Sequence, residues 1–391
     1  MTNLPQGWEV KTLSEIGEII TGSTPSKSNV EFYGKDYPFF KPSDFEQGYF
    51  LENAGDNLSK LGFGKARQLP PKTILVVCIG SLGKVALTRV IGSCNQQINA
   101  IIPHKNIISE YIYYYCISSK FQSILFSKAP QTTLAIFNKT EFSKLEIIYP
   151  KDIKEQERIV GILDFAFSKI DENIKKAKEN LANIDELMQS ALQKAFNPLK
   201  DNAKENYKLP QSWEWKSLEE ISENISAGGD KPKNCTESKT AKNQIPVYAN
   251  GVNNNGLVGY TDKATIIKPS LTISARGTIG FVCIRKEPYF PIVRLISLIP
   301  CENILCLHYL YFCLNFFIAK GEGSSIPQLT IPKFKSLQIP LPPLKEQEQI
   351  AEHLDFVFEK AKALKELYTK ELKDYEELKQ SLLNKAFKGE L

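Results

Sequence analysis

The sequence predicts an α+β protein in which two globular mixed α/β domains are joined by two long antiparallel helices that form a coiled coil. Three observations predict this fold class. The chain repeats itself, each repeat contains short β-rich runs, and each repeat closes on a long helical stretch with heptad spacing. The chain has 391 residues, which exceeds the roughly 250–300 at which a single hydrophobic core stops growing.

Three motifs each occur twice in the chain. In the first motif, nine of thirteen positions are identical between the two copies. The period of nearly 200 residues is far too long for a solenoid, so it indicates two copies of a whole domain with its connector. The motif pairs are LPQGWEVKTLSEI (4–16) with LPQSWEWKSLEEI (209–221), KEQERIVGILDFAFSK (154–169) with KEQEQIAEHLDFVFEK (345–360), and LMQSALQKAF (187–196) with LKQSLLNKAF (378–387).

The repeat divides the chain into four segments. We expect a first globular domain at 1–150, a central helix at 151–204, a second globular domain at 205–342 and a C-terminal helix at 343–391. Each helix follows a proline, which is a natural end for the preceding domain. Because the two helices occupy equivalent places in the repeat, a pseudo-twofold arrangement pairs them antiparallel.

The globular segments contain short β-rich runs, such as 73–79 and 266–274, separated by turns rich in Gly, Pro and Asn. Each also has one aromatic-rich helical stretch, at 109–126 and 304–319. The second of these is the longest apolar run, and it is shorter than the 18–20 residues a membrane span needs. We therefore expect a buried helix there and no membrane span. The N-terminus has no signal sequence, so we expect a cytoplasmic protein.

The two helical segments carry apolar residues in alternating steps of three and four. This spacing is typical of a coiled-coil seam, so we expect the two helices to pair along it. The predicted seam residues are Ile170, Ile174, Ala177, Leu181, Ile184 and Met188 in the first helix, and Val357, Ala361, Leu364, Tyr368, Leu378 and Leu382 in the second.

The net charge of +5 is unevenly distributed. The globular segments carry +3 (1–150) and +5 (203–342), whereas the helical segments carry −1 (151–202) and −2 (343–391). Five of the six arginines also lie in the globular segments. Arginine grips guanine edges and phosphates with two parallel hydrogen bonds, so this distribution favours nucleic-acid contact by the globular domains.

Motifs for catalysis and metal binding are absent from the sequence. It has no GxxxxGK[ST], no GxSxG, no NPP[FY], no CxxC pair and no HExxH, and its three histidines are dispersed. The eight cysteines lie mostly in apolar stretches, which is typical of reduced thiols in a core. We therefore predict no catalytic residue, no metal site and no cofactor bound to this chain.

The paired motifs resemble the specificity subunits of type I restriction–modification systems. In that family two variable domains each open with LPxxWExxxL and close on KEQExI before a long helix ending in QSxLxKAF. The resemblance covers essentially the whole chain. Its most specific parts are LPPLKEQEQIAEHLD (341–355) and IPVYANGV…GLVGY…ISARGTIGFV (245–282), while IIYPKDIKEQERI in the first copy lacks the usual second proline pair.

The resemblance implies a non-catalytic, sequence-specific DNA-binding subunit of a methyltransferase and endonuclease complex. Each globular domain would be a target-recognition domain that reads one half of a bipartite, asymmetric site on double-stranded DNA. The helices would set the spacing and dock two methyltransferase (modification) subunits and the restriction and translocase subunits. S-adenosylmethionine, ATP and Mg would bind those partners.

Base-reading residues can be proposed only from side-chain chemistry. Arg and Lys suit guanine, Asn and Gln suit adenine, and hydroxyls suit phosphates. In the first domain the candidates are Lys27, Lys41, Ser43, Arg67, Lys84, Gln96, Gln97, Thr132 and Thr133; in the second they are Lys231, Lys233, Asn250, Asn253, Asn254, Arg276, Arg294 and Gln328. Arg276 is the best placed of these, at a turn after a strand, although a structural ion pair explains an arginine there almost as well.

Two alternatives stay open at this point. A self-contained DNA methyltransferase or nuclease predicts activity from the purified chain with a methyl donor or Mg²⁺ alone. A coiled-coil adaptor whose globular domains bind protein predicts no salt-dependent DNA binding, whereas the DNA-reading hypothesis predicts affinity that falls steeply with salt.

Overall fold

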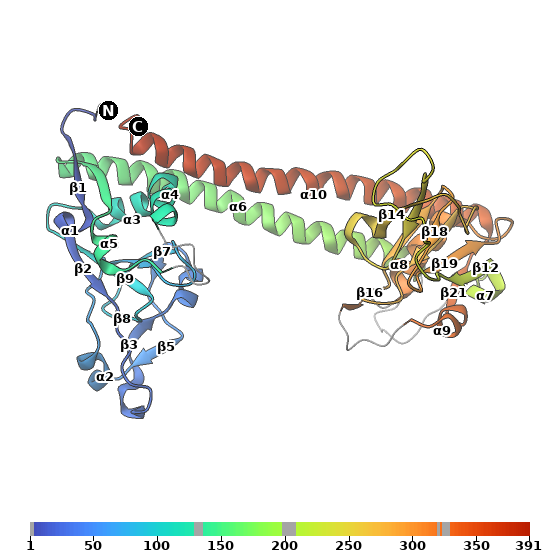
Figure 1. Cartoon of the computed structure of the whole chain (residues 1–391), viewed down its shortest axis with the longest axis horizontal. Helices are drawn as coiled ribbons and strands as arrows, with labels where there is room; N and C mark the ends of the chain where they lie inside the picture. Colours follow the sequence, from blue (N-terminus) through green and yellow to red (C-terminus); the bar gives the residue numbers. More distant parts are fainter. Residues whose placement is uncertain (1–3, 129–135, 198–208, 319–320, 323–328) are drawn as a thin grey trace. The chain divides into compact units, whose positions relative to one another are not determined.

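The computed structural model describes residues 4–128, 136–197, 209–318, 321–322 and 329–391. The chain forms two compact units (Figure 1). Unit 1 consists of Met1–Ala177 with Thr369–Leu391, and unit 2 consists of Lys178–Tyr368. Each unit therefore combines one globular domain with parts of both long helices.

Unit 1 contains a five-stranded sheet of order β2-β9-β6-β7-β4, a three-stranded sheet of order β5-β3-β8 and the antiparallel pair β1-β10. The strands are β1 (Trp8–Thr12), β2 (Gly17–Thr21), β3 (Tyr33–Phe40), β4 (Phe50–Leu51), β5 (Asp56–Leu58), β6 (Ile74–Val77), β7 (Val85–Thr88), β8 (Ser93–Cys94), β9 (Ile98–Pro103) and β10 (Glu146–Pro150). The helices are α1 (Leu13–Ile16), η1 (Val30–Phe32), η2 (Pro42–Gln47), α2 (Lys60–Lys65), α3 (Ser109–Ile117), α4 (Ser119–Lys128), α5 (Lys139–Ser143) and the long α6 (Ile153–Phe196).

The central strand β6 separates two hydrophobic clusters of unit 1. Successive side chains of a strand point to opposite faces of its sheet. Ile74 and Val76 face the helix α3, while Leu75 and Val77 face a second cluster that contains Phe40. All four β6 residues are fully buried, which explains why this strand is a continuous apolar run instead of an alternating one.

Unit 2 repeats this topology. The order β12-β19-β15-β17 matches β2-β9-β6-β7, the order β14-β13-β18 matches β5-β3-β8, and β11-β21 matches β1-β10. The strand β13 even pairs with β18 in parallel, as β3 pairs with β8. The elements are β11 (Glu214–Ser217), α7 (Leu218–Ile221), β12 (Ser222–Ala227), β13 (Ile245–Tyr248), η3 (Asn253–Gly256), β14 (Leu257–Thr261), β15 (Ser270–Ile273), β16 (Thr278–Ile279), β17 (Val282–Arg285), β18 (Phe290–Pro291), β19 (Ile296–Pro300), α8 (Leu307–Phe317), β20 (Gly321–Glu322), α9 (Ile331–Lys335), β21 (Gln338–Leu341) and α10 (Leu344–Ala386).

The aromatic-rich stretches form α3 and α4 in unit 1 and α8 in unit 2. The prediction of one helix at 109–126 was wrong, because the chain breaks at Ser118, which has extended backbone angles and a buried hydroxyl that donates to Tyr115 O. The helix α8 is largely buried in the core of unit 2, as expected. Within the described ranges, no helix is long and apolar enough to cross a membrane.

The long helices α6 and α10 span 44 and 43 residues and pair antiparallel inside each unit (Figure 1). In unit 1, Lys379 Nζ lies 2.6 Å from Asp171 Oδ1. In unit 2, Lys365 forms an ion pair with Asp185. Residues near the end of α10 thus face the first half of α6, and residues earlier in α10 face its second half.

Most of the predicted seam residues are buried or half-buried: Ile170, Ile174, Ala177, Leu181, Ile184, Met188, Val357, Ala361, Tyr368 and Leu382. Leu364 and Leu378 differ from the prediction, since they are 42% and 45% exposed. The residue three positions before Tyr368 is Lys365, and the residue four positions after Tyr375 is Lys379. These lysines occupy the seam positions that had been predicted for Leu364 and Leu378. The lysine stems pack along the seam and their ammonium groups reach aspartates on α6.

The repeated phenylalanine that ends each long helix packs into a globular core. Phe196, at the end of α6, is fully buried in unit 2 beside Tyr309, with ring centroids 5.5 Å apart. Phe387, just after α10, is buried in unit 1 against Tyr111 and Tyr115, at centroid distances of 5.5 and 5.0 Å. The QSxLxKAF motif therefore completes the core of the unit in which its helix ends.

A buried glutamine in the KEQE motif fixes the start of each long helix. Gln347 is fully buried; its carbonyl oxygen accepts from Cys306 N at 2.9 Å, and its amide donates to the carbonyl oxygens of Ile304 and Pro342, both at 2.8 Å. Gln156 makes the equivalent three bonds in unit 1, with Ile108 N and the carbonyls of Asn106 and Pro150. The motif is repeated because both junctions need the same buried connector.

Candidate nucleic-acid interface

Several chain reversals of unit 1 meet in what we call turn cluster 1, made of Thr21–Thr24, Arg67 and Asn95–Gln97. Backbone bonds hold them together: Gly22 N donates to Ile98 O at 3.0 Å and Ser23 N donates to Cys94 O at 3.0 Å. A Cβ on Gly22 would lie 2.1 Å from Asn95 O, so this close approach requires glycine. The cluster brings together three predicted residues, Arg67, Gln96 and Gln97.

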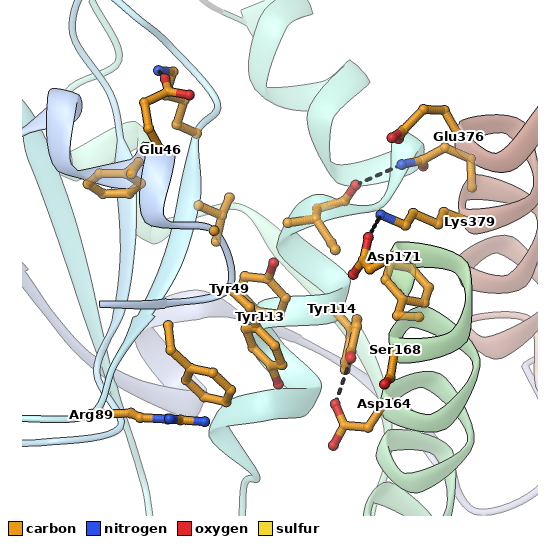
Figure 2. A pocket seen from close by; sticks show the side chains of 18 residues that line it. Glu46, Tyr49, Arg89, Tyr113, Tyr114, Asp164, Ser168, Asp171, Glu376 and Lys379 are labelled. Carbon is orange, nitrogen blue, oxygen red and sulfur yellow. Dashed lines mark hydrogen bonds and ion pairs between the residues drawn. The ribbon is translucent and has the colours of Figure 1, made fainter. Parts of the chain in front are cut away.

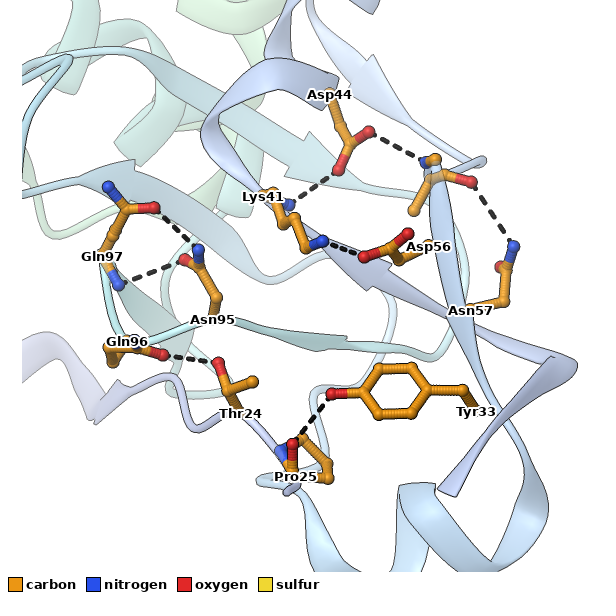
Figure 3. Close-up of polar contacts among 12 residues, drawn as sticks. Thr24, Pro25, Tyr33, Lys41, Asp44, Asp56, Asn57, Asn95, Gln96 and Gln97 are labelled. Atoms are coloured by element: carbon orange, nitrogen blue, oxygen red, sulfur yellow. Dashed lines mark hydrogen bonds and ion pairs between the residues drawn. The ribbon is translucent and has the colours of Figure 1, made fainter. Parts of the chain in front are cut away.

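Side-chain bonds orient the polar groups of turn cluster 1 (Figure 3). The hydroxyl of Thr24 donates to Gln96 Oε1, and Asn95 Nδ2 donates to Gln97 Oε1 at 2.8 Å. Gln97 also donates through Nε2 to Ile79 O at 3.4 Å, which ties the cluster to the β6–β7 turn. Gln96 is exposed whereas Gln97 is half-buried, so Gln96 presents its amide to solvent.

Lys41 and Ser43 lie at the start of η2, and Lys84 contacts the same segment. Lys41 follows strand β3 and forms an ion pair with Asp56 (Figure 3), and Ser43 is exposed on η2. Lys84 forms an ion pair with Glu46, which is also on η2. Both lysine charges are therefore partly neutralised inside unit 1.

The corresponding reversals of unit 2 form turn cluster 2, made of Gly228–Gly229, Asn250, Ala275–Gly277 and Ile292–Arg294. Gly228 N donates to Leu295 O at 2.8 Å, as Gly22 does to Ile98 O. The amide of Asn250 donates to Val293 O at 2.6 Å and accepts from Ala275 N at 2.8 Å. Asn250 therefore connects two turns, and both of its polar atoms are engaged within the unit.

Arg276 and Arg294 both line one small cavity of about 150 Å³ in turn cluster 2, together with Leu329 and Thr330. Arg294 is exposed and Arg276 is half-buried. Among the residues that the structure describes, no acidic side chain forms an ion pair with Arg67, Arg276 or Arg294. The Arg67 guanidinium donates through Nη1 to Thr21 O. Among the described residues, Arg276 and Arg294 are thus the turn-cluster arginines best placed for an anionic or base-edge partner.

The remaining predicted residues are dispersed. Lys27, Lys231, Lys233, Asn253 and Asn254 are exposed, and Asn254 has a positive φ of 48° within η3. Thr132, Thr133 and Gln328 lie outside the described residues. Arg285, a further arginine, is buried: its side chain bonds Thr272 Oγ1 at 3.0 Å and stacks over the Tyr248 ring at 3.5 Å, so it has a structural role.

Sequence reasoning missed Thr24 and Asn95, which hold the two glutamines in place. Both are short polar residues next to a chain reversal, where their side chains can bond neighbouring groups. It also missed Asp56 and Glu46, which partner Lys41 and Lys84. These pairs join residues 15 and 38 positions apart, so no local pattern could predict them.

Unit 1 also has a cavity of about 860 Å³ (Figure 2). It is lined by aromatic side chains, including Tyr49 and Tyr113, which stack at 4.1 Å, and by residues of α6 and α10. Tyr114 donates its hydroxyl to Asp164 Oδ1 at 2.6 Å. Burial raises the pKa of Tyr49 and of Tyr114, so both phenols stay neutral and serve as packing groups.

Thiols and possible metal ligands are the remaining candidate groups. Burial raises the pKa of the Cys78 and Cys94 thiols to about 12, so both are protonated at neutral pH. Within the described part of the chain, His, Cys, Asp and Glu form no group of three or more that could hold a metal ion.

Comparison with known proteins identifies the family. Residues 5–183 and 210–373 match the family model for the type I restriction modification DNA specificity domain. The chain is 40% identical over 176 residues to the type I restriction enzyme HindI specificity subunit of Haemophilus influenzae; the match covers 44% of this chain and 38% of that protein. It is 24% identical over 392 residues to the MjaIX specificity subunit of Methanocaldococcus jannaschii, covering 91% of this chain and 88% of that one.

A solved structure described as the structural basis of complex assembly and conformational transition of the type I R-M system contains a chain of similar fold. It covers 100% of both chains with a TM-score of 0.82 at 19% identity. The family model matches twice, once in each repeat and over most of the chain. The chain therefore belongs to the specificity-subunit family of type I restriction–modification systems, whose domain recognises DNA sequence.

Proposed function

We propose that this chain is the non-catalytic subunit that chooses the DNA site of a type I restriction–modification complex. Each globular domain reads one half of a bipartite site on double-stranded DNA. The halves are unlike, so the site is asymmetric. Methyl transfer and cleavage take place on partner subunits, which bind S-adenosylmethionine, ATP and Mg.

One observation carries this proposal. The two units have the same backbone scaffold but present different side chains at the equivalent turn before β9 and β19, Gln96 and Gln97 in unit 1 and Val293 and Arg294 in unit 2. Glutamine matches adenine in the major groove and arginine matches guanine. A repeated scaffold with exchanged polar groups is the arrangement that a reader of two different half-sites needs.

We place the docking of methyltransferase subunits on the long helices. Phe165 of α6 and Phe356 of α10 occupy equivalent positions of the repeated LDFxF motif and are 69% and 60% exposed. Exposed aromatic side chains are enriched as anchors of protein interfaces. Because the repeat provides the position twice, the expected number of methyltransferase subunits is two, and the restriction and translocase subunits join this core.

The test is co-expression of the chain with the methyltransferase subunit encoded beside it, followed by methylome sequencing. We expect one methylated motif made of two unlike halves separated by a fixed spacer. Exchanging residues 1–150 for the first domain of another family member should change one half of the motif and leave the other intact. Methylation that persists unchanged after deletion of this chain would contradict the proposal.

A binding titration of the assembled complex separates the two alternatives. DNA affinity should fall steeply between 50 and 200 mM salt, on the order of a hundredfold or more, because lysines and arginines displace counterions from phosphates. An adaptor that binds only protein would show no such slope. A self-contained enzyme would methylate or cleave DNA as the purified chain alone, which the proposed function does not allow.

A further inference from the structure

One β-turn occupies the same place in both turn clusters. In unit 1 it is Asn95–Ile98, closed by Ile98 N donating to Asn95 O at 3.2 Å, and in unit 2 it is Ile292–Leu295, closed by the equivalent bond at 3.1 Å. Each turn connects the parallel partner of the three-stranded sheet to the next strand of the larger sheet, β8 to β9 and β18 to β19. The two central positions are Gln96 and Gln97 in the first turn and Val293 and Arg294 in the second.

The two turns differ in backbone handedness. Val293 and Arg294 have φ values of 53° and 60°, the combination of a type I′ turn, in which Asn and Gly are the favoured residues. A β-branched residue with positive φ is a true outlier, and each such residue costs on the order of 1–3 kcal/mol. Gln96 and Gln97, at the equivalent positions of the first turn, have no positive φ. The second turn is therefore strained where the first is not.

Surrounding hydrogen bonds hold the strained turn in place. Val293 N donates to Gly229 O and Arg294 N donates to Gly228 O, both at 2.8 Å, while Val293 O accepts from the Asn250 amide at 2.6 Å. These bonds fix the backbone and leave the side chains outside. Val293 is 51% exposed, and Arg294 is also exposed. Strain that the fold maintains at an exposed position indicates that the position is used.

The side chains at the two turns differ in the hydrogen bonds that they can offer to a base. Gln96 is exposed and offers a donor and an acceptor on one amide, with Thr24 holding its oxygen. Gln97 is fixed by Asn95 and Ile79, so it positions the turn. Arg294 lies beside Arg276 at one cavity, and neither pairs with an acid among the described residues. An amide suits the N6 and N7 edge of adenine, and a guanidinium suits the O6 and N7 edge of guanine.

We propose that this turn is the specificity-determining element of both domains. Gln96 reads an adenine in the half-site of the first domain. Arg294, which lines the same cavity as Arg276, reads a guanine in the half-site of the second domain. This assignment rests on the proposed function and adds to it the residues and the bases.

The experiment uses the full chain in complex with its methyltransferase subunits. Arg294→Gln should lower methylation of duplexes with the wild-type guanine by about 10- to 100-fold, the discrimination of one bidentate contact, and should relax that single position of the second half-site. The first half-site should be unchanged. Gln96→Ala should relax one adenine position of the first half-site and leave the second unchanged.

Two further variants separate the effect of base contact from the effect of positive charge. Arg294→Lys retains the positive charge and can still donate to guanine but lacks the planar fork of arginine, so it should keep the guanine preference with weaker discrimination than the wild type. The matched control is Lys286→Gln, an exposed cation of the same unit beyond turn cluster 2, which should leave the motif unchanged. Thermal unfolding of each complex checks that the fold is intact.

The possible results separate the two proposals. If Arg294→Lys and Arg294→Gln both methylate the wild-type motif with unchanged base preference, the turn does not read DNA, although the proposed function stands. If the variants change a position in the wrong half-site, the assignment of bases to domains is wrong. If the wild-type complex itself yields no bipartite motif, the proposed function has failed.

Discussion

At the scale of single residues, local chemistry and long-range contacts decide different things. Arg67, Arg276 and Arg294 were predicted from their side-chain type, and all three lie at the turn clusters without an acidic partner among the described residues, while Arg67 donates to Thr21 O. Lys41, Lys84 and Asn250 were predicted by the same reasoning, yet their polar groups are engaged by Asp56, Glu46 and the turn backbone. Side-chain type selects candidates, whereas the partners of each candidate depend on how distant segments meet.

The strain at Val293 gives a prediction at this scale. Val293→Asn places a residue that tolerates positive φ at the first central position of the turn, and the half-exposed valine loses little burial. We expect unit 2 to gain about 1 kcal/mol of stability, which corresponds to roughly 2–4 °C in its unfolding temperature. Differential scanning calorimetry measures the shift.

The matched control for this substitution is Val252→Asn. Val252 is 45% exposed and has an ordinary φ of −91°, so no strain is relieved there. An unfolding temperature that rises equally in both variants, or in neither, would show that the turn stores no strain.

At the scale of elements, hydrophobic patterning predicted the type of element well and the register less well. The apolar run at 73–79 contains the buried strand β6, and the heptad stretches form α6 and α10. The seam of α10 was predicted through Leu364 and Leu378, but the structure places Lys365 and Lys379 there. A lysine can take a seam position because its stem is apolar and its ammonium group pairs with an aspartate on the partner helix. A search for apolar residues at heptad spacing does not detect such a lysine.

The KEQE glutamine gives a prediction at the element scale. Gln347→Ala removes three hydrogen bonds and leaves Cys306 N and two carbonyl oxygens buried without that partner. We expect a loss of roughly 2–4 kcal/mol, because each unsatisfied buried group costs about 1–3 kcal/mol. Thermal unfolding of the full chain measures the loss. Gln349→Ala, two residues away and exposed, should change the stability by less than about 0.5 kcal/mol.

At the scale of the whole molecule, each long helix begins in one unit and ends in the other. The repeated phenylalanine therefore stabilises the unit in which its helix ends and not the repeat to which it belongs in sequence. Phe387 belongs to the second repeat but lies in the core of unit 1, and Phe196 belongs to the first repeat but lies in the core of unit 2. Neither globular core is complete without residues from the other half of the chain.

Because each repeated phenylalanine lies in the core of the other repeat's unit, its substitution should destabilise that unit. Phe387→Ala should destabilise unit 1 by about 3–5 kcal/mol, the usual cost of deleting a buried phenylalanine ring, and Phe196→Ala should destabilise unit 2 by a similar amount. Hydrogen exchange resolves the two units: Phe387→Ala should lower protection in α3, and Phe196→Ala should lower it in α8. Phe356→Ala, at 60% exposure, is the control and should leave both helices protected. Loss of protection in the opposite unit from the one predicted would contradict the assignment.

The repeat, the α+β class, the buried aromatic helices, the two heptad helices and the family resemblance could all be predicted from the order of the amino acids. These features are local or periodic, so they can be read along the chain without knowing which segments meet. The folded structure was needed to show which phenylalanine completes which core, which lysines enter the seam, and which turn-cluster residues have polar partners among the residues that it describes. Those outcomes depend on hydrogen bonds, ion pairs and packing between residues far apart in sequence, and such contacts exist only once the chain has folded.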